Sequence, residues 1–245
     1  MVSIIMSAYK SQKTIAESVA SVLLQTYADW ELLIVSDDCD YKDILPIDHR
    51  IILVQNETRL ELSASRNKGV VLAKGDWIAF LDSDDVWHCS KLEKQLQFMS
   101  EHNARISYTA SAFMHSDYVM PAVELLDFKT LLRRNIMPCS SVIVERELII
   151  KHPFPCGVIT EDFASWLSIV REVGFATGLG EPLLWYRLSE GSDSSSKIHM
   201  AVKTYRAYRF VGINPVKSIF LIVNYARWTI KKRGLILKGL VEDGL

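Results

Sequence analysis

The sequence predicts an α/β protein with a central, mainly parallel sheet that helices cover on both faces. Short apolar runs alternate with segments that carry apolar residues at helical spacing. The links between these segments are short, and no internal repeat interrupts the order. Several of the apolar runs end abruptly in polar residues. Continuous apolar strands that alternate with helices are typical of a parallel sheet buried on both faces.

The first half of the chain alternates strands and helices in a regular order. We expect four buried strands, at residues 2–6, 30–35, 51–54 and 78–81. Helical spacing predicts a helix after the first strand and another after the fourth. Their apolar faces consist of Ile15, Val19, Val22 and Leu23 in the first, and of Leu92, Leu96 and Met99 in the second. Between them, Ser63 is a candidate N-cap for a helix that carries Arg66 and ends at Gly75.

The second half is less regular. Residues 106–114, 141–144 and 183–187 are expected to form strands, with a helix around residues 128–134. Thr160 is a suitable N-cap for a further helix, which Glu161 and Asp162 open and Gly174 ends. A serine-rich loop follows at residues 189–196. We therefore expect one domain over residues 1–195, with halves 1–105 and 106–195, and a C-terminal helical segment over residues 196–245.

Length and composition exclude several classes of function. The chain has 245 residues and a formal net charge of −1, which gives no bulk electrostatic case for nucleic-acid binding. Its four cysteines are scattered and lack the paired spacing of a zinc site. The start lacks the features of a signal peptide, and no run approaches the roughly 20 apolar residues that span a bilayer. We therefore expect a cytoplasmic protein with reduced thiols.

Three aspartates directly after the fourth expected strand are the most informative feature of the chain. Asp82, Asp84 and Asp85 lie within four positions. Carboxylates clustered at the end of a buried strand repel one another unless a cation or hydrogen-bond donors offset their charge. Hard oxygen ligands suit Mg²⁺ or Mn²⁺, and Mg²⁺ usually bridges one or two carboxylates to substrate phosphates. The cluster therefore favours a metal with a phosphate-bearing ligand over a solvated turn that caps the next helix.

Polar residues also follow the first two expected strands. Ser7 and Tyr9 come after the first strand, and Asp37 and Asp38 come after the second. In sheets of this kind, ligands bind beyond the carboxyl ends of the strands. We therefore expect three strand ends to converge on one crevice.

Taken together, these segments resemble the family 2 glycosyltransferases, which are inverting enzymes with the GT-A fold. The similarity runs from residue 2 to about residue 195. It rests on the segments VSIIMSAY (2–9), WELLIVSDD (30–38), ASRNKG (64–69), FLDSDD (80–85), ED (161–162) and WYR (185–187). Each motif is modest alone, but their order and spacing in one chain are specific. The resemblance implies a Rossmann-like GT-A fold and the transfer of a sugar from a nucleotide-sugar.

The resemblance implies roles on the donor side. Asp82-Ser83-Asp84 resembles the DXD motif, in which Asp84 would bind the Mn²⁺ or Mg²⁺ that bridges the donor phosphates. Asp82 would reach the ribose or the metal shell, and Asp85 could share either task. Asp38, or its neighbour Asp37, resembles the aspartate that reads the uracil imide, which favours a UDP-sugar.

Further residues are implied to contact the nucleotide-sugar. Ser7 belongs to the first motif, Tyr9 either packs against the base or belongs to the core, and Arg187 ends the last motif. Arg66 matches the nucleotide-side arginine, whose planar fork suits phosphate or carbonyl oxygens.

Asp162 resembles the catalytic base that takes the proton of the acceptor hydroxyl. A helix start would hold Asp162 ionised, although Glu161 could supply the same electrostatics. The family pattern places the base at the second acidic residue, which favours Asp162. Ser189 stands where many members carry a metal-ligating histidine, and this puts the metal affinity in doubt. The motif of processive polymer synthases is missing, which favours transfer of a single sugar.

After Pro215 the sequence becomes basic, aromatic and amphipathic. Such a helix suits the cytoplasmic face of an anionic inner membrane, or packs its apolar side on the core. We favour membrane contact, since the implied acceptor is a glycan or lipid-linked glycan of bacterial surface-polysaccharide assembly (O-antigen, capsule or exopolysaccharide). The alternative function is a catalytically weak relative that binds a nucleotide-sugar or serves as a scaffold. A dinucleotide-binding dehydrogenase is excluded because its glycine-rich motif is absent.

Overall fold

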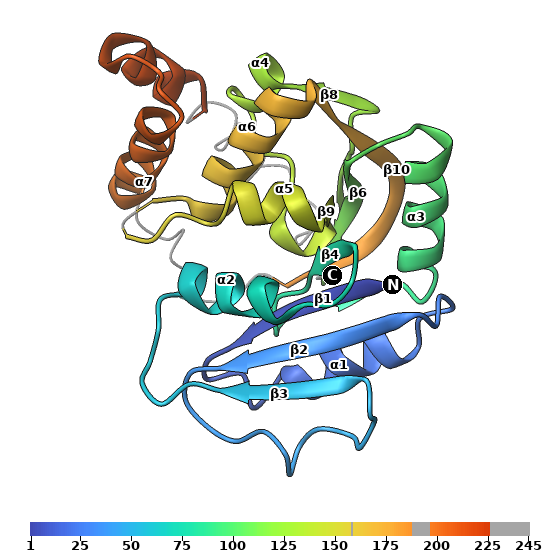
Figure 1. The fold of residues 1–245 in the computed structure, drawn as a ribbon. Helices are drawn as coiled ribbons and strands as arrows, with labels where there is room; N and C mark the ends of the chain where they lie inside the picture. The colour runs from blue at the N-terminus through green and yellow to red at the C-terminus, as the bar shows by residue number, and fades with distance from the viewer. Residues whose placement is uncertain (158, 188–196, 226–245) are drawn as a thin grey trace, which may run out of the picture.

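The computed structural model describes residues 1–157, 159–187 and 197–225. Its strands form one sheet in the order β3-β2-β1-β4-β9-β6-β10-β5, with β7 paired to β6 and β8 paired to β10 (Figure 1). The strands are β1 Val2–Ala8, β2 Trp30–Ser36, β3 Ile51–Gln55, β4 Trp77–Phe80, β5 Val86–Trp87, β6 Ile106–Phe113, β7 Ser116–Met120, β8 Leu125–Asp127, β9 Ile143–Glu145 and β10 Phe175–Tyr186. The predicted α/β class is confirmed.

The sheet is strictly parallel in its N-terminal half. β1 pairs in parallel with both β2 and β4, and β2 pairs in parallel with β3. Ala8 lies opposite Ser36, and Ile5 lies opposite Phe80, so the carboxyl ends of β1, β2 and β4 reach the same edge. This register brings the three polar strand ends together.

The second half of the sheet is mixed. β9 is antiparallel to both β4 and β6, while β6 and β10 run parallel. β10 is much longer than the strand expected at residues 183–187, and its register with β6 shifts between Leu179 and Leu184. The two-residue strand β5 pairs with the end of β10 and returns the chain from the acidic cluster to the sheet.

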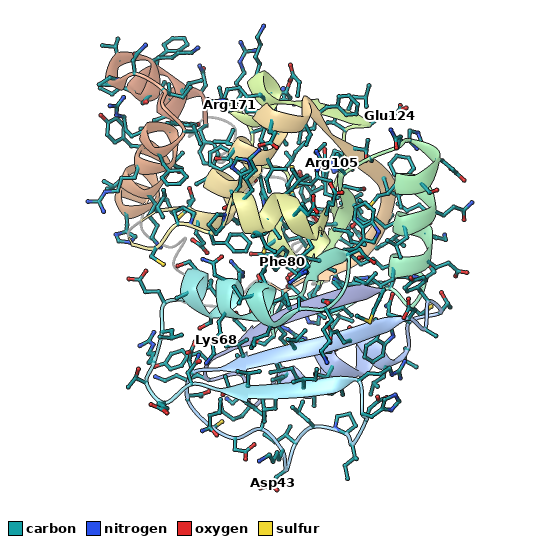
Figure 2. All side chains as sticks on the ribbon, in the orientation of Figure 1. Asp43, Lys68, Phe80, Arg105, Glu124 and Arg171 are labelled. Carbon is teal, nitrogen blue, oxygen red and sulfur yellow. The ribbon has the colours of Figure 1, made fainter. Side chains whose placement is uncertain are left out.

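Helices cover both faces of the sheet, as predicted. They are α1 Ile15–Leu23, α2 Leu62–Leu72, α3 Lys91–Glu101, α4 Phe128–Leu131, α5 Arg146–Lys151, α6 Glu161–Val173 and α7 Lys197–Phe210, with a 3-10 turn at Cys139–Ser141. One apolar cluster joins α1 and α3 to one face of β1, and a second joins α2, α5, α6 and α7 to the other. Phe80 lies inside the second cluster (Figure 2). Its ring centroid lies 5.1 Å from that of Phe154 and 5.9 Å from that of Trp166.

One helix start differs from the sequence prediction, and a second is confirmed but lacks a hydrogen bond from its N-cap side chain. α2 begins at Leu62 after Glu61, so Ser63 lies inside the helix and is not its N-cap. α6 begins after Thr160 as expected, but the Thr160 side chain makes no capping hydrogen bond. Asp162 Oδ1 accepts from the backbone N–H of Phe163 (2.6 Å) instead. α2 ends at Leu72, and Gly75 lies so close to β1 that a Cβ there would sit 2.7 Å from Ser3 N.

A further helix over residues 215–225, the C-terminal helix, returns the chain to the core. Asn214 caps it through a 2.8 Å hydrogen bond from Lys217 N to Oδ1, and Pro215 occupies the favoured first position. Leu221 and Tyr225 pack against the cluster that contains α6. Ser189 and residues 226–245, including the basic residues expected there, lie outside the described residues. In the described part of the chain, no helix combines the length and hydrophobicity needed to cross a bilayer.

Candidate active site

The acidic cluster lies in the turn between β4 and β5, where one serine organises it. Ser140 Oγ accepts from the backbone N–H of Asp82 (3.0 Å) and donates to Asp85 Oδ2 (2.6 Å). The other oxygen of Asp85 accepts from Arg187 N (2.9 Å). Both oxygens of this buried carboxylate are therefore committed to the protein.

Asp84 has a different environment from Asp85. Its carboxylate accepts no hydrogen bond from another side chain among the described residues, although the residue is half-buried. Burial raises its pKa to about 6, and the negative charge of Asp82 contributes to the shift. The pKa of Asp85 is raised as well, first by burial and then by Asp82 and Asp84. The cluster thus carries negative charge that the protein compensates only in part.

Arg66 connects this cluster to the start of α6. Its Nη2 lies 2.5 Å from Asp82 Oδ1, and its Nη1 lies 3.1 Å from Glu161 Oε1. The residue is only 4% exposed. Burial alone would lower the pKa of Arg66, but Asp82, Glu161 and Asp162 outweigh it and raise the pKa, so the guanidinium stays charged. Arg66 therefore brings together two acidic segments that are far apart in sequence.

Asp162 lies beside this pair in the first turn of α6. Burial and the neighbouring Glu161 raise the pKa of Asp162 to about 7, against the opposing effects of Arg66 and the N–H of Phe163. The expectation that the helix start would hold Asp162 ionised is therefore wrong in direction. Burial outweighs the helix dipole because a charged carboxylate loses its hydration there.

Asp38 is held at the carboxyl end of β2 by donors from the loop after β1. Its Oδ2 accepts from Lys10 N (2.8 Å) and Gln12 Nε2 (3.1 Å), and its Oδ1 accepts from the Tyr41 hydroxyl (2.8 Å). Burial opposes ionisation, but these hydrogen bonds prevail and lower the pKa of Asp38. Asp38 is thus an ionised, exposed acceptor at the carboxyl end of β2.

Asp37 points to a different place. Its Oδ1 accepts from Asn56 Nδ2 (2.7 Å) and Leu60 N (3.1 Å), and its Oδ2 accepts from Ser65 Oγ (2.7 Å). It fastens the loop before α2 and the helix itself to the end of β2. Of the two neighbouring aspartates, Asp38 has the more accessible carboxylate.

The loop after β1 meets the acidic cluster directly. Ser11 Oγ and Ser83 Oγ lie 2.6 Å apart and are buried. Tyr9 is 36% exposed and is not a core residue; the Arg59 guanidinium stacks 3.9 Å from its ring centroid. Ser7 Oγ is buried and has no hydrogen-bond partner among the described residues. These contacts place the first and fourth strand ends side by side.

Arg187 lies on the other side of the cluster. Its Nε donates to the backbone carbonyl of Asp84 (2.8 Å), and its Nη2 pairs with Glu17 of α1. The guanidinium thus holds the turn of the cluster through the main chain and adds positive charge next to it.

The described residues contain no group of three or more His, Cys, Asp or Glu side chains that could hold a metal ion. This agrees with the commitment of Asp85 to Ser140 and Arg187. Asp84 and Asp82 fit a divalent cation in a more limited way. Asp84 has no ion pair among the described residues, whereas Asp82 shares its charge with Arg66. Two such hard carboxylates suit Mg²⁺ or Mn²⁺ when phosphates and water supply the remaining ligands.

Several residues that shape the site were not among those predicted for it. Ser140 comes from the 3-10 turn before β9, and Tyr41 and Ser11 both reach the crevice through hydroxyl groups. The sequence offers Glu161 only as the alternative to Asp162 at the helix start. Of these two residues, Glu161 is the one that pairs with Arg66. No sequence signal marks Ser140, because its partner Asp85 is 55 positions away.

The sheet order, the polar strand ends and the acidic turn after β4 define a GT-A type sugar-transferring protein, and comparisons with known proteins agree. The family model "Glycosyl transferase family 2" matches residues 3–121. TuaG of Bacillus subtilis (strain 168), a protein named for teichuronic acid biosynthesis, is 37% identical over 246 residues, which cover 95% of this chain and 97% of TuaG. The chain therefore belongs to glycosyltransferase family 2 and is an enzyme of that class.

A second relative and a solved structure extend this result. WfgD of Escherichia coli, named as a UDP-Glc:alpha-D-GlcNAc-diphosphoundecaprenol beta-1,3-glucosyltransferase, is 34% identical over 247 residues, which cover 98% of this chain and 97% of WfgD. The S. aureus TarS 1–349 structure in complex with UDP-GlcNAc superimposes with a TM-score of 0.68 at 16% identity, covering 92% of this chain and 71% of that 1–349 chain. The predicted GT-A fold and family are confirmed.

Proposed function

We propose that this glycosyltransferase moves one sugar from a UDP-sugar to a hydroxyl of a lipid-linked saccharide, with inversion at the anomeric carbon. The observation that carries the proposal is the Arg66 bridge, because it joins the acidic cluster to the helix start that bears Asp162. A donor diphosphate at the cluster and an acceptor hydroxyl at Asp162 would then meet in one crevice. WfgD, which aligns along nearly the whole chain, is named for such a reaction.

On the donor side, Asp38 accepts from the uracil imide, since its ionised carboxylate is accessible and fixed by three donors. Tyr9 flanks the base. The Arg59 guanidinium, which stacks on the Tyr9 ring, either moves away from the ring or covers the base. The unpartnered Ser7 hydroxyl faces a polar ligand, and Ser83 fixes the loop after β1. Arg66 and Arg187 contribute positive charge near the diphosphate.

Asp84, with Asp82, would hold Mn²⁺ or Mg²⁺ together with the donor phosphates. When bound, the cation supplies Lewis-acid stabilisation of the charge on the departing diphosphate. Asp85 positions the turn of the acidic cluster, since its two oxygens accept hydrogen bonds from Ser140 Oγ and Arg187 N.

Asp162 acts as the general base of the transfer. It takes the proton of the acceptor hydroxyl while the hydroxyl oxygen bonds to the anomeric carbon. The bond from that carbon to the diphosphate oxygen breaks, and its electron pair leaves with UDP. This direct displacement requires one catalytic carboxylate, which is consistent with the pairing of Glu161 to Arg66.

The C-terminal helix supports a peripheral contact with a membrane. Val216, Ile219, Phe220 and Val223 are exposed at helical spacing, so they form one apolar stripe. The opposite side packs on the core through Ser218 and Leu221. Both alternatives for this segment therefore find support, one on each face. A lipid-linked acceptor of surface-polysaccharide assembly would be met at such a surface, and residues 1–195 would form the catalytic domain.

A screen of nucleotide-sugars tests the proposal. Thermal stabilisation and hydrolysis are measured with and without Mn²⁺, and we expect a UDP-sugar to give the largest response. Asp162→Asn should abolish transfer and keep UDP affinity, whereas the exposed control Asp43→Asn (Figure 2) should change neither. Unchanged turnover in Asp162→Asn would remove Asp162 as the base.

A further inference from the structure

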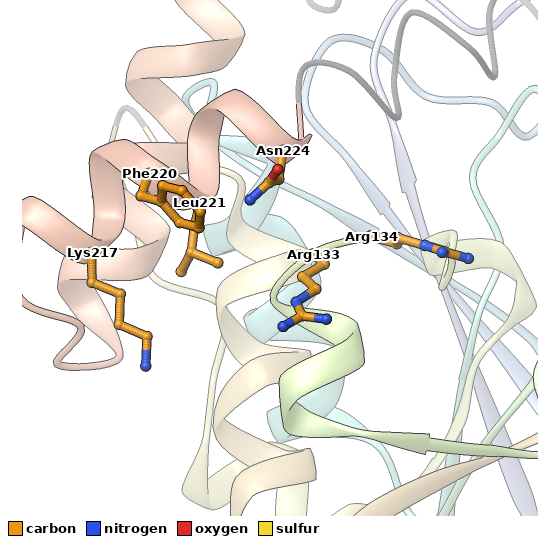
Figure 3. Close-up of a pocket in the computed structure, with 6 residues that line it drawn as sticks. All are labelled: Arg133, Arg134, Lys217, Phe220, Leu221 and Asn224. Atoms are coloured by element: carbon orange, nitrogen blue, oxygen red, sulfur yellow. The ribbon is translucent and has the colours of Figure 1, made fainter.

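A cationic cavity lies outside the strand-end crevice, between the segment after α4 and the C-terminal helix. Its lining residues are Arg133, Arg134, Lys217, Phe220, Leu221 and Asn224 (Figure 3). Its volume of about 470 Å³ is in the range of small-molecule sites. A turn after α4 and the C-terminal helix, which are far apart in the sequence, therefore build one concave surface.

The charge of the cavity is one-sided. Arg133, Arg134 and Lys217 line it, and among the described residues no acidic side chain does. None of the three cations forms an ion pair with another described residue, whereas other arginines such as Arg50, Arg66 and Arg105 do. Unpaired cations around a hollow favour an anionic ligand, and arginine forks suit phosphate in particular.

The rim of the cavity is apolar. Phe220 is exposed at its edge, while Leu221 is buried below it. Phe220 also belongs to the exposed apolar stripe of the C-terminal helix. A ligand that fits both parts carries phosphate at one end and a hydrocarbon chain at the other.

The cavity adjoins the candidate active site through both of its walls. Asn224 precedes Tyr225, whose ring centroid lies 5.9 Å from that of Phe163, the neighbour of Asp162. Burial raises the pKa of Tyr225, and the charge of Asp162 adds to the shift. On the other wall, the chain runs from Arg134 to Ser140, which holds the acidic cluster. Both walls of the cavity are therefore close in sequence to residues that contact the candidate site.

We propose that Arg133, Arg134 and Lys217 bind the diphosphate of a prenyl-diphosphate-linked saccharide, with its hydrocarbon chain along Phe220 and the exposed stripe. This inference rests on the proposed function and specifies the acceptor class. It gives the enzyme two phosphate sites, one for the donor at the acidic cluster and one for the acceptor at the cavity. The acceptor sugar would then span the space between the cavity and Asp162.

Binding of farnesyl diphosphate to the full chain tests the proposal. The affinity is measured by calorimetry with saturating UDP and Mn²⁺, so that the donor site is filled. The triple variant Arg133→Gln/Arg134→Gln/Lys217→Gln should bind about tenfold or more weakly, because charge-assisted hydrogen bonds are lost. The control Lys74→Gln/Lys129→Gln/Lys151→Gln removes the same charge from exposed positions outside the cavity and should bind like the wild-type chain.

Three further ligands separate the sources of the effect. Farnesol should bind neither protein well, and inorganic diphosphate should bind more weakly than farnesyl diphosphate, because each lacks one half of the ligand. Phosphatidylglycerol vesicles test the bilayer headgroup as the source. If the triple variant loses vesicle binding and keeps farnesyl diphosphate affinity, the cavity is a membrane contact and the proposal is overturned.

Failure of this inference is distinguishable from failure of the proposed function. Equal farnesyl diphosphate affinity in the wild-type chain and the triple variant overturns the acceptor site, whatever the result for UDP. If the wild-type chain does not bind UDP, the donor proposal is overturned. The farnesyl diphosphate affinities of the wild-type chain and the triple variant, measured without UDP, then still test the acceptor site. All three substituted side chains are exposed, and thermal unfolding verifies that the variant folds.

Discussion

The buried Arg66 and the partly exposed Asp82 form an ion pair, with 2.5 Å between Nη2 and Oδ1. The other arm of the same guanidinium lies 3.1 Å from Glu161. One side chain from α2 therefore sets the spacing between the turn after β4 and the start of α6. Removing one partner of such a buried set leaves an uncompensated charge, which costs about 3–5 kcal/mol in comparable cases.

Arg66→Lys should lower the activity strongly although it keeps the charge. An ammonium group cannot form both arms of the fork, so either Asp82 or Glu161 loses its partner. We expect a loss of about 1–3 kcal/mol in the free energy of unfolding and a raised KM for the donor. Urea unfolding and steady-state kinetics measure the two effects.

Arg105→Lys is the matched control, because Arg105 pairs with Glu145 in an exposed position. It should change the unfolding free energy by less than about 0.5 kcal/mol. If Arg66→Lys behaves like this control in both measurements, the bridge does not organise the site.

The strand ends are the part of the site that the sequence could predict. Asp38 and Asp82 follow continuous apolar runs, and the parallel pairing of β1, β2 and β4 places such ends at one edge. Hydrophobic patterning is local and strong, so the strands of the first half were found within one or two residues. The capping contacts were less predictable, because Ser63 lies inside α2 and Thr160, the N-cap residue of α6, makes no side-chain cap hydrogen bond.

The contacts between distant segments could not be predicted from the same patterns. Whether Asp85 faces a metal or a hydroxyl depends on Ser140, which a separate turn brings to it. The protonation of Asp162 depends on burial that only the packed α6 creates. A sequence marks which carboxylates are available, but the surrounding structure decides which of them are already hydrogen-bonded.

Ser140→Ala should destabilise the fold more than Ser141→Ala, although both residues are fully buried. Ser140 Oγ accepts a hydrogen bond from Asp82 N and donates one to Asp85 Oδ2. Ser141 Oγ donates only to the nearby carbonyl of Pro138. Leaving two buried polar groups without a partner should cost about 2 kcal/mol or more. Chemical denaturation measures the difference, and equal losses in the two variants would show that Ser140 does not organise the acidic turn.

Asp84→Asn should weaken the metal-dependent part of UDP binding. Asp84 has no ion pair with another described residue, and burial raises its pKa to about 6. A bound cation would lower this pKa again, because it favours the ionised carboxylate. Calorimetry with UDP in Mn²⁺ and in EDTA measures the metal-dependent gain. We expect the gain to fall about tenfold in Asp84→Asn and to persist in the exposed control Asp117→Asn. Equal gains in both variants would remove Asp84 from the metal site.

The activity should rise with pH through the range around 7, because a general base must be deprotonated. Burial raises the pKa of Asp162 to about 7, and the charged or titratable groups around it are Glu161 on its own helix, Arg66 from α2, Asp82 after β4 and Tyr225 from the C-terminal helix. The profile of kcat/KM against pH measures the inflection. Glu161→Gln removes a like charge and should move the inflection to lower pH. A profile that both proteins share would assign it to another group.

Lys91→Met should stabilise the protein. Lys91 is fully buried on α3, where its Nζ donates to Gln95 Oε1 (2.8 Å) and lies 4.2 Å from the Trp87 ring centroid. No carboxylate pairs with it among the described residues, and burial lowers its pKa from 10.5 to about 7. Replacing a poorly compensated buried charge by an apolar side chain of similar length should add about 1–3 kcal/mol to the free energy of unfolding. The gain is smaller than it would otherwise be, because Gln95 Oε1 loses its hydrogen-bond donor.

The sign of the pH dependence separates this effect from simple repacking. Between pH 7 and 10.5 the unfolded chain holds the Lys91 proton that the folded chain has released, so the stability of the wild-type chain rises with pH in this window. The gain from Lys91→Met should therefore be largest below about pH 7 and should shrink toward pH 10. Urea unfolding at pH 6.5 and pH 9.5 measures it, with Lys94→Met on the exposed face of α3 as the control. A gain that is equal at both values, or a loss at both, would mean that the buried charge of Lys91 does not limit stability.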